Sequence, residues 1–200
     1  MVTNSTTACA RVNGNPGKMM PLVAVRYLVI HRTSLDHYDA RANPNPVDNI
    51  DLSGIQLAEA FANKGLGTGG RIPYHFLVRA DSKVEQMLPL TQRGAHAIGY
   101  NYRSIGIACV GDYRYQPPTP EVWDQLVRLV AALLPLNGGL MLAGHSDLQG
   151  ATGDTGKVCP GKHLPIGELA EQVVGLLGKD WKSLPGDYVI SSLTDAGYTV

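Results

Sequence analysis

Two histidines and one cysteine of this 200-residue chain, His31, His145 and Cys159, each stand beside an apolar run in a turn-rich segment. Imidazole and thiolate ligands suit zinc better than magnesium or calcium. Structural zinc usually takes four protein ligands, whereas catalytic zinc takes about three and leaves one position to a water whose pKa falls to about 7. The three residues therefore predict a zinc site with one open position, suited to catalysis.

The same residues also have a structural interpretation. A lone histidine after a strand is more often hydrogen-bonded than metal-bound, and a lone cysteine is often a small core residue. Cys159, however, stands between Lys157 and the Pro160-Gly161 turn, and His145 precedes the polar pair Ser146-Asp147. Both side chains are thus expected in loops where they can converge. From these residues alone, the metal site and the structural interpretation both stay open.

Predicted strands position the two histidines. Residues 25–30 are mostly apolar and β-branched, which predicts a strand that ends just before His31. Residues 140–143 form a second short apolar run before His145. Active-site residues often follow strands in sheets that are covered by helices. Further strands are expected at 74–79 and 84–88, paired as a β-hairpin, and at 104–110.

Helices are expected to cover this sheet. Ser53 begins a capping-box pattern, which predicts a helix of about three turns before Gly65. Thr119-Pro120 is a good helix start, and apolar residues then recur at helical spacing. Residues 166–177 carry the last predicted helix. The chain is therefore expected to be a single α/β domain, a central mixed β-sheet flanked by helices. The expected divisions are an irregular leader at 1–21, a catalytic domain at 22–178 and a tail of unknown role at 179–200.

Composition argues against several function classes. Lysine plus arginine and aspartate plus glutamate number 17 each, so the chain lacks the basic excess of nucleic-acid-binding proteins. No apolar run approaches the roughly 20 residues of a membrane span. The start of the chain lacks the apolar core of a secretory signal, which predicts synthesis in the cytoplasm without a Sec signal. The three cysteines cannot all pair with one another, so free thiols are expected.

Four segments, in order along about three quarters of the chain, carry a resemblance to a known family. They are Leu28-Val29-Ile30-His31, Ile72-Pro73-Tyr74-His75-Phe76-Leu77-Val78, Gly94-Ala95-His96-Ala97-Ile98-Gly99-Tyr100-Asn101 with Ser104-Ile105-Gly106-Ile107, and Gly144-His145-Ser146-Asp147-Leu148 with Lys157-Val158-Cys159-Pro160-Gly161. The chain resembles the zinc-dependent N-acetylmuramoyl-L-alanine amidases, which share a fold with peptidoglycan recognition proteins. Its pattern is closest to the short phage endolysin amidases.

The resemblance implies roles for five residues. His31, His145 and Cys159 would bind one Zn²⁺ per chain, and Tyr74 and Lys157 would assist catalysis. A lysine close to a metal ligand can stabilise the charge of a tetrahedral oxyanion, and a tyrosine can donate a hydrogen bond to it. Without the resemblance, Tyr74 would be interpreted as a packed strand tyrosine and Lys157 as a solvated loop charge.

The resemblance also implies the substrate. The bond cleaved would be the amide between the lactyl group of N-acetylmuramic acid and L-alanine in peptidoglycan, and His96 and Asn101 would contact that substrate. The alternative for these two residues is that they hold a loop through side-chain to backbone hydrogen bonds. An enzyme of this kind would be bacteriolytic and antimicrobial, acting on the cell wall.

One departure from the family pattern distinguishes between two kinds of amidase in that family. The recycling enzymes of the family carry a glutamate after the Ser104–Ile107 segment, where this chain has Ala108-Cys109. Short phage lysis amidases also lack that glutamate, which favours a phage-type lysin. Three alternatives stay open, namely a cytosolic muropeptide-recycling amidase, a peptidoglycan-binding protein, and a protein that binds a polymerase or another partner.

Two further titratable residues receive no catalytic role. His75 neighbours Tyr74 in a predicted strand, so its side chain is expected on the opposite face and in a structural role. Glu85, in the second strand of the predicted hairpin, is expected to be a surface charge.

Overall fold

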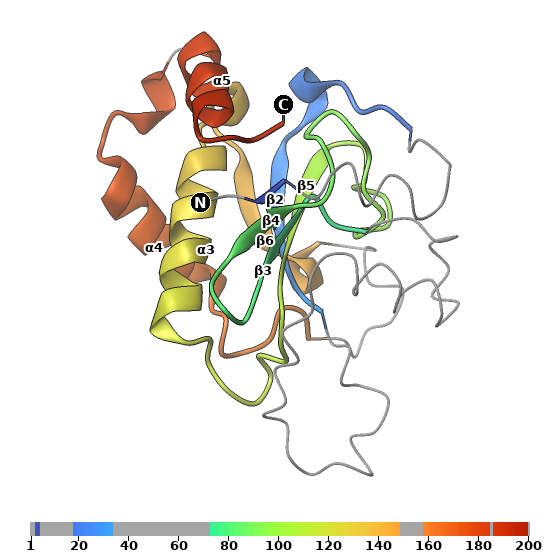
Figure 1. The fold of residues 1–200 in the computed structure, drawn as a ribbon, viewed down its shortest axis with the longest axis vertical. Coiled ribbons are helices and arrows are strands. Elements are labelled where there is room, and N and C mark those ends of the chain that lie inside the picture. Colours follow the sequence, from blue (N-terminus) through green and yellow to red (C-terminus); the bar gives the residue numbers. More distant parts are fainter. Residues whose placement is uncertain (1–2, 5–17, 34–72, 149–157, 185, 200) are drawn as a thin grey trace.

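The computed structural model describes residues 3–4, 18–33, 73–148, 158–184 and 186–199. Within these residues, six strands form one mixed sheet in the order β1-β4-β3-β5-β2-β6 (Figure 1). Only the β3–β4 pair is antiparallel among the strand pairs described. The strands are β1 (Thr3–Asn4), β2 (Tyr27–Arg32), β3 (Phe76–Val78), β4 (Val84–Gln86), β5 (Ser104–Cys109) and β6 (Met141–Gly144).

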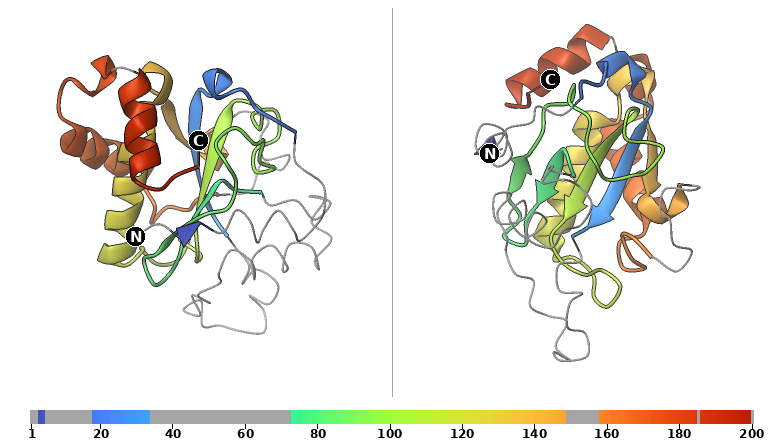
Figure 2. Two further views of the ribbon diagram at one scale, coloured as in Figure 1. Left: turned by 45° about the horizontal axis from the view of Figure 1, so that its top comes forward. Right: turned by 90° about the vertical axis from the view of Figure 1, so that its right-hand side faces the viewer.

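Three α-helices lie together on one face of this sheet (Figure 2). α3 (Pro120–Leu133) starts where the sequence predicts, because Pro120 fits the first helical turn and the Thr119 hydroxyl accepts a hydrogen bond from the Val122 N–H. α4 (Ile166–Leu177) and α5 (Gly186–Asp195) follow. Short 3-10 helices complete the described elements: η1 (Leu22–Ala24), η3 (Leu136–Gly138), η4 (His145–Asp147) and η5 (Trp181–Ser183). The expected α/β fold is confirmed.

The alternation of β2 decides which face of the sheet carries the site. Leu28 and Ile30 are fully buried in the core that includes Leu126 of α3. Val29 lies in a separate buried cluster on the other face. Because side chains alternate along a strand, His31 shares the face of Val29, opposite the helices.

The segment after residue 178, which the sequence left unassigned, forms part of the fold. Trp181 of η5 and Leu193 of α5 are buried in the same core as α3. The Tyr198 ring packs edge-on against Phe76 with 5.4 Å between centroids, and the Thr199 N–H donates to Gln86 Oε1 at 2.7 Å. This part of the chain therefore closes one side of the helical core and ends against β4.

The strand and helix boundaries follow the sequence closely. β2 runs two residues further than predicted, so that His31 lies within the strand rather than after it. Within the expected leader, Met20 is buried in the core and Thr3–Asn4 pair with β4. The helix predicted from Ser53 lies outside the described residues.

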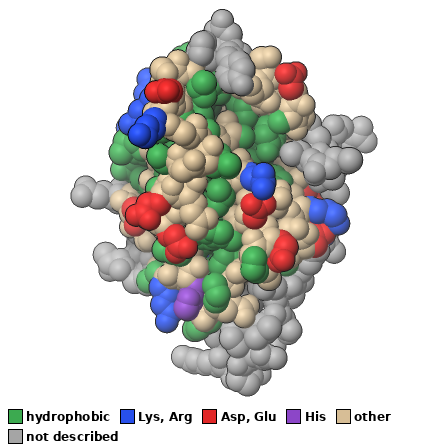
Figure 3. Space-filling model, turned by 90° about the vertical axis from the view of Figure 1, so that its left-hand side faces the viewer, with side chains coloured by type: hydrophobic (Ala, Val, Ile, Leu, Met, Phe, Trp, Pro, Cys, Tyr) green, Lys and Arg blue, Asp and Glu red, His purple; other side chains and the backbone are tan. Residues whose placement is uncertain are grey.

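The helical face carries interspersed acidic and basic side chains with apolar side chains between them (Figure 3). This agrees with the balanced charge of the sequence. No helix in the described part of the chain is both long enough and apolar enough to span a membrane.

Candidate metal centre

His31, His145 and Cys159 converge at one end of β2 and β6. These strands are parallel neighbours with Ile30 paired to Gly144, so the two histidines that follow these positions lie side by side. Their ring centroids are 4.6 Å apart. One donor atom from each of the three residues lies within 4.8 Å of the other two. The structure therefore brings together all three residues predicted as metal ligands.

The chemistry and spacing of this cluster fit zinc. Cys159 Sγ is 3.9 Å from His31 Nδ1. In a tetrahedral zinc site the S and N ligand atoms lie roughly 3.5 Å apart, given Zn–S and Zn–N bonds of about 2.3 and 2.0 Å. Burial, with smaller contributions from His96 and His145, holds the pKa of His31 well below its usual value. His31 is therefore neutral near pH 7, as a metal ligand must be.

A short 3-10 turn holds His145. The N–H of Gly144 donates to Asp147 Oδ2 at 2.7 Å, which fixes the start of η4. A Cβ atom at position 144 would lie 2.9 Å from Pro160 Cδ, so only glycine allows the 158–161 segment to pack this closely. Gly144 thus brings the histidine and the cysteine segments into contact.

The backbone around Cys159 is held on both sides. The Cys159 carbonyl accepts hydrogen bonds from the N–H and the hydroxyl of Ser146, both at 2.9 Å. On the other side, Arg32 Nη1 donates to the carbonyl of Val158 and, at 3.4 Å, to that of Pro160. Since these carbonyls flank Cys159, the contacts fix the direction from which its thiol enters the cluster.

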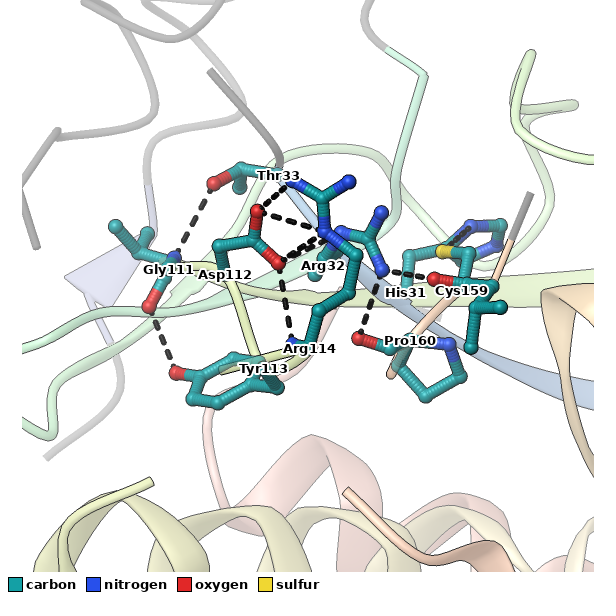
Figure 4. Close-up of polar contacts among 11 residues, drawn as sticks. His31, Arg32, Thr33, Gly111, Asp112, Tyr113, Arg114, Cys159 and Pro160 are labelled. Carbon is teal, nitrogen blue, oxygen red and sulfur yellow. Dashed lines mark hydrogen bonds and ion pairs between the residues drawn. The ribbon is translucent and has the colours of Figure 1, made fainter. Parts of the chain in front are cut away.

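Arg32 is itself held by a buried carboxylate (Figure 4). Its Nε lies 3.3 Å from Asp112 Oδ1, and both side chains are almost fully buried. Arg114 Nε contacts both oxygens of Asp112, at 2.8 and 2.9 Å. Burial alone would raise the pKa of Asp112, but hydrogen bonds from Arg114 and the charge of Arg32 outweigh it and lower the pKa. The carboxylate is therefore ionised and shared by two guanidinium groups.

The sequence did not predict that Arg32, paired with Asp112, holds the backbone on either side of Cys159. A signal was available, since an arginine directly after an apolar strand needs a partner when the strand end is buried. Its partner Asp112 lies 80 positions further along the chain, and no spacing rule links the two.

Tyr74 borders the cluster, as the resemblance implies. Its ring centroid is 5.0 Å from that of His31, and the side chain is buried. Burial, with a further contribution from Cys159, raises the pKa of the Tyr74 phenol. The phenol therefore keeps its proton at neutral pH and is able to donate a hydrogen bond.

His96 and Asn101 have clear partners within the protein. His96 Nδ1 is 3.0 Å from His31 Nε2, and its Nε2 is 3.3 Å from Ser104 Oγ. Asn101 Oδ1 accepts hydrogen bonds from the N–H groups of His96 and Ala97 at 2.9 and 2.8 Å. Asn101 thus holds the loop, which is the alternative raised from the sequence. The predicted substrate contacts of these two residues stay predictions.

Two expectations about neighbouring residues are wrong. Glu85 is not a surface charge: it is 4% exposed and pairs with Arg79 Nη1 at 2.8 Å, because β4 lies inside the sheet between β1 and β3. His75 does not face away from Tyr74, since both rings approach His96, with centroids at 5.8 and 6.5 Å. Strand alternation fails here because β3 begins only after these two residues.

His75 nevertheless has a structural environment. Its Nδ1 accepts from the Gly106 N–H at 3.0 Å, and its Nε2 bonds the Gln92 carbonyl at 2.8 Å.

Lys157, predicted to assist catalysis, lies outside the described residues.

Comparison with known proteins places the chain in a family. Peptidoglycan-recognition protein SC1a/b of Drosophila simulans is 28% identical over 141 residues, which cover 69% of this chain and 69% of that protein. The endolysin of Enterobacteria phage T3 is 32% identical over 94 residues, 44% of this chain and 58% of that protein.

Among solved structures, the N-acetylmuramoyl-L-alanine amidase LysC from Clostridium intestinale URNW superposes with a TM-score of 0.63. It is 23% identical, over 86% of this chain and 97% of that one, and so supports the fold. The family described as N-acetylmuramoyl-L-alanine amidase matches residues 21–162, which is more than half of the chain. The chain therefore belongs to the N-acetylmuramoyl-L-alanine amidase family.

Proposed function

We propose that this protein is a zinc-dependent N-acetylmuramoyl-L-alanine amidase that degrades peptidoglycan as a phage-type cell-wall lysin. The observation that carries the proposal is the cluster of His31, His145 and Cys159, whose donor atoms lie within 4.8 Å of one another. Three protein donors of these types suit one zinc ion with a free coordination position. When bound there, zinc would supply a Lewis acid and a water of lowered pKa.

The reaction is hydrolysis of an amide. The C–N bond between the lactyl carbonyl and the L-alanine nitrogen breaks, the oxygen of water joins the carbonyl carbon, and a proton moves to the departing amine. The protonated Tyr74 borders the cluster and is suited to donate a hydrogen bond to the oxyanion that forms on the way. Lys157, two positions before Cys159, is proposed to stabilise the same negative charge.

The absence of the glutamate that recycling enzymes carry after the Ser104–Ile107 segment supports the lysin over a recycling enzyme. Ala108 is the direct strand partner of His31 across the β2–β5 pair. A methyl group stands at that position, so a base cannot come from it. The roles proposed for this chain's own residues are therefore limited to Tyr74 and Lys157, which would stabilise the oxyanion, while a bound zinc ion would lower the pKa of the attacking water.

A second candidate is peptidoglycan binding without catalysis, which the similarity to a peptidoglycan-recognition protein favours. The presence of Cys159 in the cluster argues for the enzyme, because a pure binding protein does not need a third metal ligand. Peptidoglycan is the proposed substrate or ligand in both cases.

The test is mass spectrometry of the products released from purified peptidoglycan sacculi, with and without a chelator and with zinc added back. An amidase should release stem peptides with free L-alanine amino termini, lose this activity with chelator and regain it with zinc. Cleavage of soluble muropeptides but not of sacculi would instead identify the recycling enzyme. Binding to sacculi with no product from either substrate would favour the recognition protein.

A further inference from the structure

The ring of His96 lies in a space that two glycines leave for it. A Cβ atom on Gly106 of β5 would lie 2.7 Å from the nearest atom of the His96 ring, and one on Gly94 would lie 2.8 Å from His96 Cδ2. Asn101 fixes the backbone at the same point by accepting from the His96 N–H. His96 is 7% exposed, so its side chain is held within the packed protein.

A chain of polar contacts runs from His31 through this ring to the backbone. His31 Nε2 lies 3.0 Å from His96 Nδ1, His96 Nε2 lies 3.3 Å from Ser104 Oγ, and Ser104 Oγ lies 2.8 Å from the Tyr100 carbonyl oxygen. All four groups come from the sheet face opposite the helices or from the loop above it.

The direction of each hydrogen bond follows from the last acceptor. A carbonyl oxygen only accepts, so the Ser104 hydroxyl donates its proton to Tyr100. Ser104 Oγ then presents a lone pair to His96, and His96 Nε2 must carry a proton to meet it. In a neutral imidazole the other nitrogen is the acceptor, so His96 Nδ1 accepts from His31 Nε2–H.

We propose that His96 is a positioning residue that holds His31 in the tautomer with its proton on Nε2, so that the lone pair of Nδ1 points toward Cys159 and His145. His31 Nδ1 is the nitrogen that lies 3.9 Å from Cys159 Sγ, whereas Nε2 is turned toward His96. The proposal rests on the proposed zinc site and adds the groups that prepare it. A histidine ligand whose second nitrogen donates a hydrogen bond is fixed in orientation and is a stronger base toward the metal.

The first experiment reads the tautomer directly in the metal-free protein. Nitrogen-15 NMR of histidine-labelled protein distinguishes a protonated ring nitrogen from one with a free lone pair, and His31→Gln identifies the His31 signals. His31 is expected to carry its proton on Nε2. A His31 ring with its proton on Nδ1 would overturn the proposal, even if the protein binds zinc.

The second experiment removes the hydroxyl group of Ser104, which lies at the end of this hydrogen-bond series away from His31. Ser104→Ala removes the acceptor of His96 without touching His31, and His31 is expected to become a mixture of tautomers with zinc affinity lowered several-fold. Ser183→Ala is the matched control, because Ser183 Oγ also donates to a carbonyl, that of Asp180, in the distant η5. Unchanged His31 signals and zinc affinity in Ser104→Ala would contradict the proposal.

A third comparison separates a positioning role from simple packing. His96→Leu fills the space without polar atoms, whereas His96→Gln offers an amide acceptor and donor. Zinc affinity, measured by competition with a chelator, is expected to fall about 10- to 100-fold in His96→Leu and to recover in part in His96→Gln. Equal losses in the two variants would show a packing role only.

If the wild-type protein keeps the Nε2 proton on His31 yet binds no zinc, the proposed function fails while the hydrogen-bond chain stands.

Discussion

The guanidinium of Arg32 donates a hydrogen bond to the carbonyl oxygen of Val158, the residue before Cys159. Arg32 directly follows His31 in β2. One of these two adjacent residues is therefore a proposed metal ligand, and the other holds the backbone beside a second proposed ligand, Cys159. The geometry of the cluster thus depends on a side chain that binds no metal.

Arg32→Met should weaken zinc binding. The variant keeps most of the aliphatic stem but releases the carbonyls that flank Cys159, and we expect a loss of about tenfold or more in zinc affinity. Competition with a chelator measures it. Arg128→Met is the control, since Arg128 forms an exposed pair with Asp124 on α3. Wild-type zinc affinity in Arg32→Met would show that Arg32 does not position Cys159.

Cys159→Ser should lower zinc content and amidase activity together, because a hydroxyl is a poor zinc ligand beside a thiolate. Cys109→Ala is the matched control. Cys109 lies in the core on the helical face, and burial raises the pKa of its thiol to about 12, so it is expected to play no part in zinc binding. Elemental analysis and the sacculus assay measure the two effects. Full activity in a zinc-free Cys159→Ser protein would refute the zinc mechanism.

Lys157→Ala should keep zinc and lose rate, because the proposed role of Lys157 is confined to the transition state. Removal of one oxyanion-stabilising group costs on the order of 100-fold in kcat. Lys162→Ala, at an exposed position in the same segment, should leave both zinc content and kcat unchanged. An equal loss of zinc and of rate in Lys157→Ala would mean that the two roles are not separate.

His75 should make the metal-free protein less stable as the pH falls from about 6.5 to about 4. Burial lowers the pKa of His75 to about 4, whereas an unfolded histidine titrates near 6.5. The unfolded state therefore binds the proton first, and stability present above pH 6.5 is lost as the pH falls, by up to about 3 kcal/mol. Urea denaturation at several pH values measures this.

His75→Gln keeps a neutral donor and acceptor and should flatten that pH dependence relative to the wild type. His163→Gln, whose histidine lies away from the sheet, should retain the wild-type slope. A His75→Gln protein with the slope of the wild type would place the acid sensitivity in other groups.

Leu193→Ala should destabilise the protein by about 2–5 kcal/mol, the range for a leucine truncated in a packed core. Leu193 of α5 is 1% exposed within the core that contains α3. Leu176→Ala in α4 is the control, since Leu176 is 57% exposed and its loss should cost less than about 0.5 kcal/mol. Equal denaturation midpoints for the two variants would show that α5 adds nothing to stability.

Local patterns were sufficient to predict most of the sheet and the helices that cover it. α4 has the predicted bounds, and α3 begins at the predicted proline, because capping and helical periodicity are written in neighbouring residues. The three proposed ligands were found because their residue types are rare, because apolar runs come before the two histidines, and because Cys159 stands in a turn-rich segment. α5 escaped detection because its few apolar residues stand among small and polar ones.

The partners of the ligands could not be predicted, because they depend on contacts between distant segments. His96 lies 65 positions from His31, and its place depends on the absence of side chains at Gly94 and Gly106. The Arg32 contacts with Asp112 and Val158 span even longer separations. Glu85 was misassigned because a carboxylate in a hairpin strand normally faces solvent, whereas here the added β1 and the pair with Arg79 accompany its burial.

The pairing of β2 has a consequence for how the protein is produced. β2 ends at residue 32, yet its two neighbours in the sheet begin at Ser104 and Met141. During translation, the apolar Leu28–Ile30 segment emerges from the ribosome long before either partner exists. Parallel strands joined by long connections fold slowly and expose aggregation-prone edges meanwhile. Nascent chains that stall before residue 104 should therefore aggregate.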